Sequence, residues 1–473
     1  MTEDHPAIMI GLEVHVELAT PTKLFCACAR TGDELPNART CTVCLGYPGA
    51  RPYPARAAVE MGLRVALALS CSLAPRLVFS RKTYFYPDLA KGYQMTQYED
   101  PIGAGGKLRL PSGQTIFLQR VHLEEDPAAL SYPSTMQDAP YALIDYNRSG
   151  SPLLEIVTTP SLRDAHTARE FLTELVKVLL HLGVYDPHTC VLKTDVNVSL
   201  RETKYVRVEM KNIAGAHELQ AALEYEIVRQ RIMHANGQPI VRETRGWDAK
   251  DLRTFSMRSK ETEEEYGYIT EPDIPPYAID ESWSAQLRAS VPELPLQRAE
   301  RYVSLGISPD DAIVLVADPA LTLLFERLLT AGSDPTLCAR WIRRELLRVL
   351  NYAGLSPATS PVTPEELIEL FHMIAGDEIT DASGKRIIEQ LIQERISPRA
   401  YATTHGLFRV VDRAQLDAAV RTVFGEHVNA ITDYRAGEQK ALQYLIGQVM
   451  RATRGTYDPA IVQSAVLDAL HVS

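Results

Sequence analysis

Residues 10–18 read IGLEVHVEL, in which apolar side chains alternate with Glu13, His15 and Glu17. Successive side chains of a β-strand point to opposite faces of a sheet, so this alternation predicts a strand with one buried face and one polar face. The same period of two recurs in three later segments: LLEIV (153–157), TDVNVSLR (194–201) and VRVEMKNI (206–213). The first part of the chain is therefore expected to be a mixed, strand-rich unit.

Helical periodicity also appears, first within this unit and then throughout the rest of the chain. A helix is expected from about Thr167 to Leu182, with Gly183 as its stop. After two proline-punctuated linkers, EPDIPPY and VPELPLQR, helical patterns dominate. The sequence thus predicts an α+β protein with a strand-rich domain at 1–290, a helical domain at 296–404 and a helical tail domain at 405–473.

The composition limits what the chain can bind. In 473 residues, 49 Lys and Arg stand against 60 Asp and Glu, and a net charge of -11 argues against a general nucleic-acid binder. No apolar run reaches membrane-spanning length, and the N-terminal segment carries acidic residues where a secretory signal carries basic ones. With an odd number of cysteines and no targeting segment, we expect a reduced, cytoplasmic protein without a membrane partner.

Four of the cysteines form two tight pairs, C-x-C and C-x-x-C. Each pair can aim two thiolates at one point, and two pairs complete the tetrahedral sulfur set of a structural zinc site. The expected Zn²⁺ ligands are Cys26, Cys28, Cys41 and Cys44. Buried free thiols or a redox dithiol are the alternatives.

Acidic residues on predicted strands suggest a second metal site. Glu13 and His15 share one strand face, HLEEDP supplies Glu124, and Glu155 stands alone in the apolar strand SPLLEIV. A carboxylate in an apolar strand needs a partner, and hard cations prefer carboxylate oxygens. We expect a Mg²⁺ site at Glu13, His15, Glu124 and Glu155, the alternative for the first strand being a solvated face.

Basic and aromatic residues gather in FSRKTYFYPDLAKGYQ (79–94). Arg81, Lys82 and Lys91 suit a triphosphate, and the interleaved tyrosines suit a base, although such residues also make ordinary strand surfaces. The nearby GAGGKL (103–108) lacks the spacing of a phosphate-binding loop and is expected to be a hairpin turn.

The three remaining cysteines do not resemble catalytic nucleophiles. Cys71, Cys190 and Cys338 lie in LSCSL, HTCVL and TLCAR, without a surrounding glycine elbow. If this protein makes an amide, its ammonia must come from another protein chain.

These motifs together resemble those of the GatB family, one of the component families of the aspartyl/glutamyl-tRNA amidotransferase. The resemblance rests on IGLEVHVEL, CTVCLGYPG, RKTYFYPDLAKGYQMTQYE, HLEEDP, DYNRSGSPLLEIV, TDVNVSLR, VEMKNI, MRSKE, EPDIPP and DYRAGEQKALQYLIGQVMRATRG, which span nearly the whole chain. It implies a cradle-like catalytic domain, a helical domain and a tail domain that clasps tRNA.

The resemblance also implies an activity and partners. Members of this family use ATP and Mg²⁺ to phosphorylate the side-chain carboxylate of Asp-tRNA(Asn) or Glu-tRNA(Gln). Ammonia from the amidase subunit then displaces the phosphate, and a small third subunit holds the other two together. A non-discriminating aminoacyl-tRNA synthetase is a further candidate partner. Which misacylated tRNA is used in the cell cannot be read from the sequence.

Site residues carried over from the family fall on matching motifs of this sequence. The Mg²⁺ ligands fall on the four residues proposed above, and the four paired cysteines match the zinc knuckle. The ATP and substrate candidates are Arg81, Lys82, Tyr84, Tyr86 and Lys91, followed by Asn147, Arg148, Lys211 and Asn212. The departures from the family pattern are Ala90 and Pro127, which put only local loop geometry in doubt.

Contacts to tRNA are expected to be local. From His405 onward the chain has equal numbers of basic and acidic residues, so the tail has no bulk positive field. The candidates there are Arg435, Lys440, Arg451 and Arg454. A cluster in the helical domain, Arg340, Arg343, Arg344 and Arg348, is either a tRNA contact or a solvated helix face.

Two other functions compete with the amidotransferase hypothesis. A zinc-braced tRNA-binding or assembly protein would use the acidic residues only for structure. A stand-alone carboxylate kinase would act on free amino acids and would not need the helical and tail domains.

Overall fold

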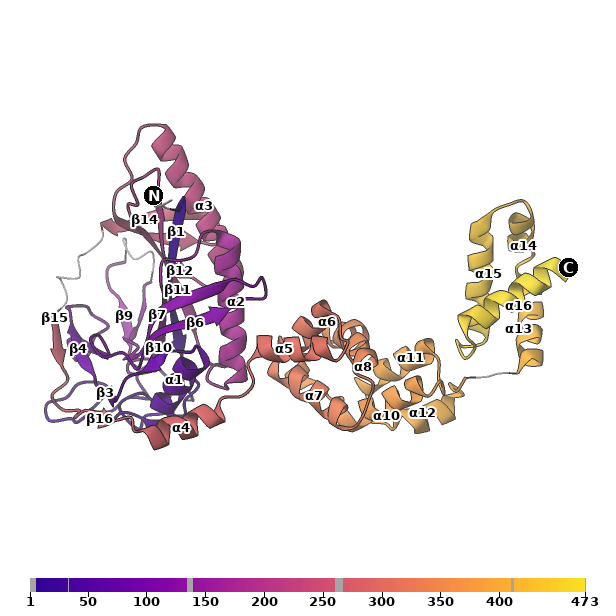
Figure 1. Cartoon of the computed structure of the whole chain (residues 1–473), viewed down its shortest axis with the longest axis horizontal. Coiled ribbons are helices and arrows are strands. Elements are labelled where there is room, and N and C mark those ends of the chain that lie inside the picture. The colour runs from indigo at the N-terminus through magenta and orange to yellow at the C-terminus, as the bar shows by residue number, and fades with distance from the viewer. Residues whose placement is uncertain (1–5, 33, 134–138, 260–266, 410–411, 473) are drawn as a thin grey trace. The chain divides into compact units, whose positions relative to one another are not determined.

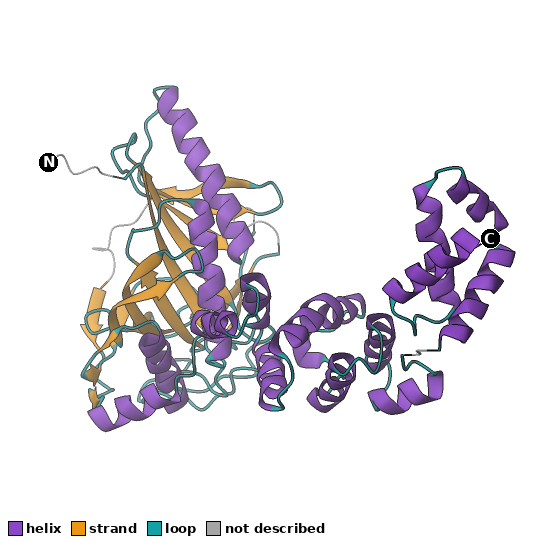
Figure 2. Ribbon diagram, turned by 45° about the vertical axis from the view of Figure 1, so that its right-hand side comes forward, coloured by secondary structure: helices purple, strands orange, loops and turns teal. Residues whose placement is uncertain are grey.

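The computed structural model describes residues 6–32, 34–133, 139–259, 267–409 and 412–472. The chain divides into two compact units, Met1–Leu296 and Gln297–Ser473. Strands and helices mix in the first unit, whereas the described part of the second is helical (Figures 1 and 2). The predicted α+β class is confirmed.

A nine-stranded sheet organises the first unit. Its strand order is β14-β13-β12-β11-β1-β10-β7-β6-β2, and its neighbours are antiparallel except for β12 and β13. The strands are β1 (Ile8–Glu17), β2 (Ser72–Leu73), β6 (Gly103–Arg109), β7 (Thr115–Glu125), β10 (Pro152–Thr158), β11 (Leu192–Leu200), β12 (Val208–Ile213), β13 (Glu243–Asp248) and β14 (Arg253–Ser259). The segments in which the sequence showed a period of two are thus neighbouring strands β11, β12, β1 and β10.

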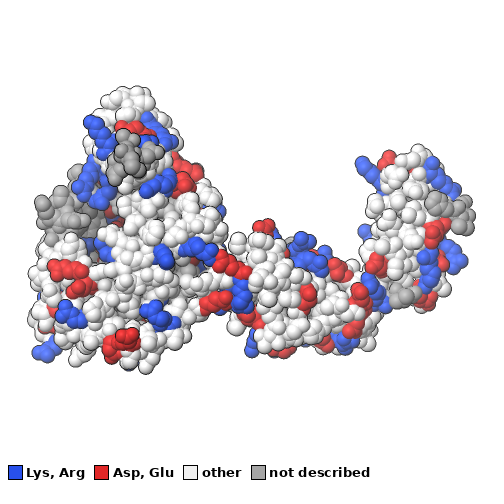
Figure 3. Space-filling model, in the orientation of Figure 1, with Lys and Arg blue, Asp and Glu red and all other residues white. Residues whose placement is uncertain are grey.

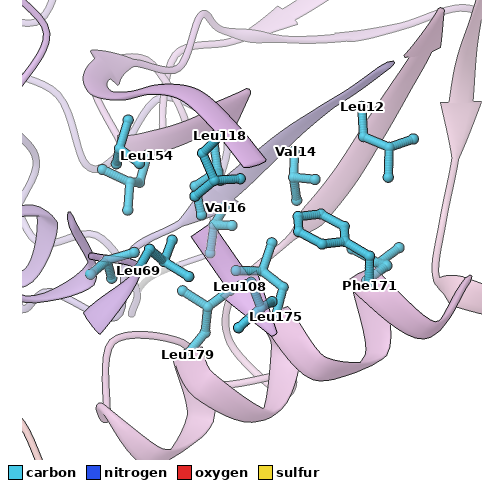
Figure 4. Close-up of a cluster of buried hydrophobic side chains, with 14 of the residues drawn as sticks. Leu12, Val14, Val16, Leu69, Leu108, Leu118, Leu154, Phe171, Leu175 and Leu179 are labelled. Atoms are coloured by element: carbon cyan, nitrogen blue, oxygen red, sulfur yellow. The ribbon is translucent and has the colours of Figure 1, made fainter. Parts of the chain in front are cut away.

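One face of this sheet is apolar and covered by helices. These are α1 (Arg56–Ala68), α2 (Ala165–His181) and α3 (Ala216–Ala235). On β1, Leu12, Val14 and Val16 are buried and lie in one cluster with Phe171 and Leu175 of α2 (Figure 4). The residues between them on β1 point to the other face, which is polar and carries the candidate site.

Helix α2 forms where the sequence predicted it. Its start is fixed by Asp164, whose carboxylate accepts a 2.7 Å hydrogen bond from the Thr167 amide. Its end is followed by Gly183 at φ +66°, a left-handed conformation that glycine adopts without strain.

Smaller sheets complete the first unit. The strands β15 (Gly267–Thr270), β4 (Ser80–Thr83) and β5 (Tyr93–Thr96) form a three-stranded sheet in that order. Two further pairs are β16 (Tyr277–Ala278) with β3 (Arg76–Leu77) and β8 (Ala129–Ser131) with β9 (Leu143–Asp145). Helix α4 (Glu281–Ser290) follows them.

The expectation of a hairpin turn at GAGGKL is wrong, because this segment is strand β6. Its glycines permit close packing: a Cβ at Gly103 would lie 2.8 Å from the Ala66 Cβ, and one at Gly106 would lie 2.5 Å from the Cys71 Sγ. The turn comes later, where the Gly113 amide donates to the Leu110 carbonyl over 2.9 Å.

The second unit consists of short helices. They are α5 (Pro295–Ser304), α6 (Pro309–Leu315), α7 (Pro319–Thr330), α8 (Pro335–Trp341), the π-helical η2 (Ile342–Leu346), α9 (Leu347–Tyr352), the 3₁₀ helix η3 (Pro357–Thr359), α10 (Pro364–Ala375), α11 (Asp381–Leu391), α12 (Pro398–His405), α13 (Arg413–Glu426), α14 (Val428–Arg435), α15 (Gln439–Ala452) and α16 (Pro459–Val472). Among the helices of both units, none in the described part of the chain is long and apolar enough to cross a membrane.

Two separate hydrophobic clusters lie in the second unit. One runs from Ala299 to Leu407, and the other from Leu416 to Leu470. The predicted tail helix is α15, with Leu442, Leu445 and Val449 in the second cluster. Because Leu407 packs with the earlier helices, the change of core lies beyond His405; the division at 296–404 and 405–473 stays a prediction.

Truncating a core residue tests this packing. We expect Leu175→Ala to lower the stability of the first unit by about 3 kcal/mol, because the buried side chain leaves a cavity against β1. The measurement is denaturant unfolding, followed by hydrogen exchange of peptides from residues 1–296. The matched control Leu143→Ala, at a side chain that is 61% exposed, should change stability by less than about 0.5 kcal/mol. Equal effects of the two variants would contradict the assigned core.

Candidate active site

A row of ionisable side chains crosses three adjacent strands on the polar face. In the strand register His15 of β1 stands opposite Glu155 of β10, and Glu155 stands opposite His122 of β7. The His15 Nε2 atom lies 3.3 Å from Glu155 Oε2, and the His122 Nε2 atom lies 3.4 Å from the same oxygen. Glu155 is only 5% exposed, so a buried carboxylate is held between two imidazoles.

Two further carboxylates join this row. The His15 Nε2 atom lies 3.7 Å from Glu124 Oε1 and 3.9 Å from Glu13 Oε1. The Glu124 side chain is buried, whereas those of Glu13 and His15 are 30% and 21% exposed. The four predicted Mg²⁺ ligands are therefore brought together at a site that opens toward solvent on the β1 side.

The donor set fits a divalent cation. Glu13, His15 and Glu155 form one group whose ligand atoms lie within 4.8 Å of one another, and His122, Glu124 and Glu155 form a second. Glu155 belongs to both. Its Oε1 atom is buried and has no hydrogen-bond partner among the described residues, although Arg120 Nη2 lies 3.5 Å away. A hard cation would satisfy such an oxygen.

The ionisable groups of the row shift one another's pKa values. Burial alone would raise the pKa of Glu155, but the adjacent His122 and His15 lower it well below its usual range. Burial opposes the charged form of His15, yet its hydrogen bond to Glu155 and the surrounding carboxylates raise its pKa to about 10. Burial, followed by the charge of Glu155, raises the pKa of Glu13 to about 8.

Sequence reasoning missed His122. It lies between Arg120 and Glu124 at a spacing of two on β7, so all three point to the same sheet face. The alternation in RVHLE carries this signal, but only the strand order reveals that β7 pairs with β10. Asp195, which stands opposite Glu13 on β11, was missed for the same reason.

Two of the three predicted phosphate-binding cations, Arg81 and Lys91, are held by carboxylates. Arg81 donates to both oxygens of Glu271 over 2.8 Å, and its guanidinium lies 4.4 Å from the centre of the Tyr93 ring. Lys91 pairs with the buried Glu125, the residue that follows Glu124. Lys91 thus reaches the residue adjacent to the carboxylate row.

The aromatic candidates lie close to these cations. The Lys82 Nζ atom lies 5.8 Å from the centre of the Tyr84 ring. Tyr86 is 39% exposed, and the intervening Phe85 is fully exposed. Tyr84, Phe85 and Tyr86 thus follow Lys82 on the loop that joins β4 to β5, and their contact with a nucleotide base stays a prediction.

The remaining candidates divide between two places. Lys211 pairs with Asp195 and lies 3.6 Å from Glu209 Oε1, so it borders the Glu13 end of the row. Nearby charges, above all that of Asp195, raise the pKa of Lys211 despite its burial. Asn212 is exposed and has φ +66°, where β12 shifts register against β11. Arg148 instead pairs with Asp126 in a separate turn.

The Asn147 side chain forms hydrogen bonds with two backbone groups of a distant loop. Its side-chain oxygen accepts a 2.7 Å hydrogen bond from the Arg39 amide, and its side-chain nitrogen donates to the Leu35 carbonyl over 2.7 Å. The side chain is nearly buried, at 3% exposure. These contacts tie the turn at 145–150 to the loop between the two cysteine pairs.

The four paired cysteines form a compact sulfur group. Their Sγ atoms all lie within 4.8 Å of one another, and the Cys41 amide donates to the Cys44 Sγ over 3.1 Å. A hydrogen bond from Cys26, opposed by burial, lowers the pKa of Cys44 to about 5. A hydrogen bond to Cys44 raises the pKa of Cys26, and burial raises that of Cys28 to about 11. Four sulfurs this close together fit the tetrahedral site of a structural Zn²⁺. Burial raises the pKa of Cys71 to about 11 and that of Cys338 to about 12.

Two family models match the chain. The GatB/GatE catalytic domain matches residues 8–285, and the GatB domain matches residues 323–470. The chain belongs to the GatB family. The resemblance inferred from its motifs is thereby confirmed, although Lys260 and Glu261 of the MRSKE motif lie outside the described residues.

Curated members of the GatB family are similar along their whole length. The chain is 39% identical over 472 residues to the B-type subunit of the aspartyl/glutamyl-tRNA(Asn/Gln) amidotransferase from Carboxydothermus hydrogenoformans, with 98% of each chain covered. It is 40% identical to the proteins of the same name from Persephonella marina and Thermus thermophilus, with 98% of this chain and 99% of each relative covered.

Basic residues of the second unit differ in their surroundings. On the face shown in Figure 3, basic and acidic side chains are interspersed over its helices. Arg343 pairs with Asp311 at 2.7 Å and Arg348 with Glu389 at 2.9 Å, which favours a solvated, ion-paired face for these two. In the described part of the tail, the exposed residues without an ion pair include Arg435, Lys440, Arg451 and Arg454.

Replacing Glu155 tests the metal centre. We expect Glu155→Gln to weaken Mn²⁺ binding, used as a Mg²⁺ substitute, by more than about 10-fold, because Glu155 is shared by both ligand groups. Titration calorimetry on the full chain measures the affinity. The control Glu170→Gln, on helix α2 that covers the opposite face of the sheet, should bind Mn²⁺ as the unmodified chain does. Unchanged binding in Glu155→Gln would remove the metal centre from this row.

Replacing Asn147 separates a structural from a nucleotide-binding role. Asn147→Ala removes the hydrogen bonds that the side chain makes with the Arg39 amide and the Leu35 carbonyl, so we expect the first unit to lose about 1–3 kcal/mol of stability. The KM for ATP should stay the same. The exposed Asn351 provides the control substitution. A raised KM at unchanged stability would instead make Asn147 a nucleotide ligand.

Proposed function

We propose that the chain is the carboxylate-activating subunit of a glutamine-dependent tRNA amidotransferase. The substrates are Asp-tRNA(Asn) or Glu-tRNA(Gln), and ATP is the phosphoryl donor. The observation that carries the proposal is the row of Glu13, His15, Glu124 and Glu155 across β1, β7 and β10, in a chain of the GatB family. The relatives' name, which assigns them to the aspartyl/glutamyl-tRNA(Asn/Gln) amidotransferase, supplies the substrate class.

The proposed reaction has two bond exchanges. A side-chain carboxylate oxygen of the tRNA-bound amino acid attacks the γ-phosphorus of ATP, and the bond to the ADP oxygen breaks. Ammonia then attacks the acyl carbon, and phosphate leaves. Both exchanges depend mainly on positioning and on neutralising charge.

The acidic row supplies a place for Mg²⁺. Glu13, His15, Glu124 and Glu155 would hold the ion, and His122 is an additional candidate because it contacts Glu155. When bound, the ion would neutralise charge on phosphate oxygens. Glu155 is kept ionised by its two histidines, so it presents an anionic oxygen without first losing a proton.

Basic residues around the row orient the anionic substrates. Lys91 is held by Glu125 next to the row, and Lys211 is held by Asp195 at its other end. Arg81 is fixed by Glu271 and stacks on Tyr93, so its guanidinium loses little further freedom when a phosphate approaches. Lys82, Tyr84 and Tyr86 lie on or directly after β4 of the three-stranded sheet and are further nucleotide candidates. Arg148 and Asn212, with Asn147 as tested above, complete the candidate set.

Ammonia is assigned to another protein of the complex. The structure describes all seven cysteines: four form the sulfur group, and Cys71, Cys190 and Cys338 are buried. None of these three suits a glutaminase nucleophile. The proposal therefore includes the amidase subunit and the small third subunit as partners, a cytoplasmic location, and a non-discriminating synthetase as a candidate for transient association.

Recognition of tRNA is assigned to the tail at 405–473. Arg435, Lys440, Arg451 and Arg454 can meet phosphates because their charges are exposed and not neutralised by described carboxylates. Lys440 also lines a hollow of about 580 Å³ together with His427 and Tyr444. The strand-rich domain at 1–290 and the helical domain at 296–404 complete the proposed division.

The decisive experiment measures ATP turnover by the chain assembled with its amidase and small partners. Asp-tRNA(Asn) or Glu-tRNA(Gln) should stimulate turnover. Glu124→Ala should lower the stimulated rate about 100-fold, which corresponds to about 3 kcal/mol of transition-state stabilisation. Glutaminase activity of the amidase should persist in the variant complex.

Glu170→Ala is the matched control and should keep the stimulated rate. Full turnover in Glu124→Ala would exclude the acidic row as the catalytic site. If misacylated tRNA leaves the unmodified complex unchanged, the chain acts instead as a zinc-braced binding module. Turnover with free aspartate or glutamate in place of tRNA would favour a stand-alone carboxylate kinase.

A further inference from the structure

Lys23 is a fully buried lysine beside the sulfur group. Its exposed fraction is 0%, and it precedes the first cysteine by only three positions. The Nζ atom lies 3.7 Å from the Cys44 Sγ and 3.1 Å from the Tyr146 carbonyl oxygen. Within the described ranges, no carboxylate forms an ion pair with it. Lys23 belongs neither to the acidic row nor to the nucleotide candidates, so the proposed function gives it no role.

A buried ammonium needs negative charge nearby. Burying one without a counter-charge costs several kcal/mol, and a single carbonyl dipole offsets only part of that cost. Four thiolates around one divalent cation carry a net double negative charge, which gives the missing counter-charge. Lys23 and the four cysteines therefore compensate each other's charge. Lys23 neutralises part of the negative charge of the metal site, and that negative charge makes the burial of Lys23 favourable.

Lys23 also connects the sulfur group to the turn at 145–150. On one side it binds the Tyr146 carbonyl, and the neighbouring Leu24 amide donates to the Gly150 carbonyl over 2.8 Å. The Ser149 hydroxyl donates to the Cys44 carbonyl over 3.3 Å. The same turn carries Arg148, which pairs with Asp126.

The loop between the cysteine pairs forms hydrogen bonds with the other side of this turn. The Asn37 amide donates to Asp145 Oδ1 over 2.9 Å, and the Tyr146 amide donates to Asn37 Oδ1 over 2.8 Å. The turn at 145–150 is therefore held by Lys23 on one side and by the loop between the cysteine pairs on the other. The positions of Lys23 and of this loop both depend on the position of the cysteines.

We infer that Lys23 is a positioning residue that balances the charge of a metal bound by Cys26, Cys28, Cys41 and Cys44 and links that metal to the turn at 145–150. Metal occupancy then controls the order of the turn. The inference goes beyond the proposed function: it rests on the metal site of the cysteines, and it does not depend on ATP or tRNA.

The test uses three variants of the full chain. Lys23→Met removes the charge and keeps an unbranched side chain, whereas Lys23→Arg keeps the charge. Lys177→Met is the matched control, because Lys177 is a nearly buried lysine of α2 that pairs with Glu174 away from the cysteines. Zn²⁺ affinity is measured by competition with a chromophoric chelator, and Co²⁺ substitution reports the thiolate charge-transfer band.

Lys23→Met should weaken Zn²⁺ binding about 10-fold to 100-fold and shift the Co²⁺ charge-transfer band, and Lys23→Arg should restore part of both. In the metal-free chain Lys23→Met should lower the unfolding temperature by less than it does in the Zn²⁺-bound chain, because only the Cys44 thiolate then remains beside the ammonium. A lysine with a purely structural role would change stability by the same amount with and without metal. Lys177→Met should leave both metal readouts unchanged.

Hydrogen exchange of peptides covering residues 144–151 reports the turn. Exchange should accelerate when Zn²⁺ is removed from the unmodified chain and when Lys23→Met is studied at a subsaturating Zn²⁺ concentration. If the unmodified chain holds no Zn²⁺ or Co²⁺ at all, the cysteine site and the inference both fall. If it holds the metal and Lys23→Met changes neither affinity nor exchange, the inference alone is overturned.

Discussion

The first unit depends on one buried carboxylate in the middle of its large sheet. Glu155 lies in a strand whose neighbouring residues are almost all buried, and its charge is stabilised by His15 and His122 from the strands on either side. Such a carboxylate is costly without these partners. The register of β1, β10 and β7 places imidazoles from both neighbouring strands at its oxygens, and the same register assembles the acidic row.

Alternation along the strands made much of this site predictable. The IGLEVHVEL segment places Glu13 and His15 on one face and the apolar core residues on the other, and both assignments hold in the sheet. Glu155 was found because a lone acid in an apolar strand requires a partner. The paired cysteines were found from spacing alone, since two short pairs can meet at one point without knowledge of the fold.

The other contacts around the site depend on which strands and distant segments lie side by side, and local sequence patterns do not contain this information. His122 joins the row because β7 lies beside β10, and Arg81 is held by Glu271, which is 190 residues away. The glycines of GAGGKL suggested a turn, but they are needed where β6 passes close to Ala66 and Cys71. Asn147 matched a site motif, yet its amide group is occupied by the loop between the cysteine pairs. The family motif placed Asn147 in a turn beside the cysteine loop, and only the folded structure shows which backbone groups its side chain contacts.

We propose that the polar face of the sheet holds a divalent cation at Glu155. Anomalous diffraction from crystals of the full chain soaked in Mn²⁺ would locate such an ion. We expect a peak within coordination distance of Glu155 and of at least two of His15, Glu124 and Glu13. A peak elsewhere on the chain, with these side chains still paired only to one another, would contradict it.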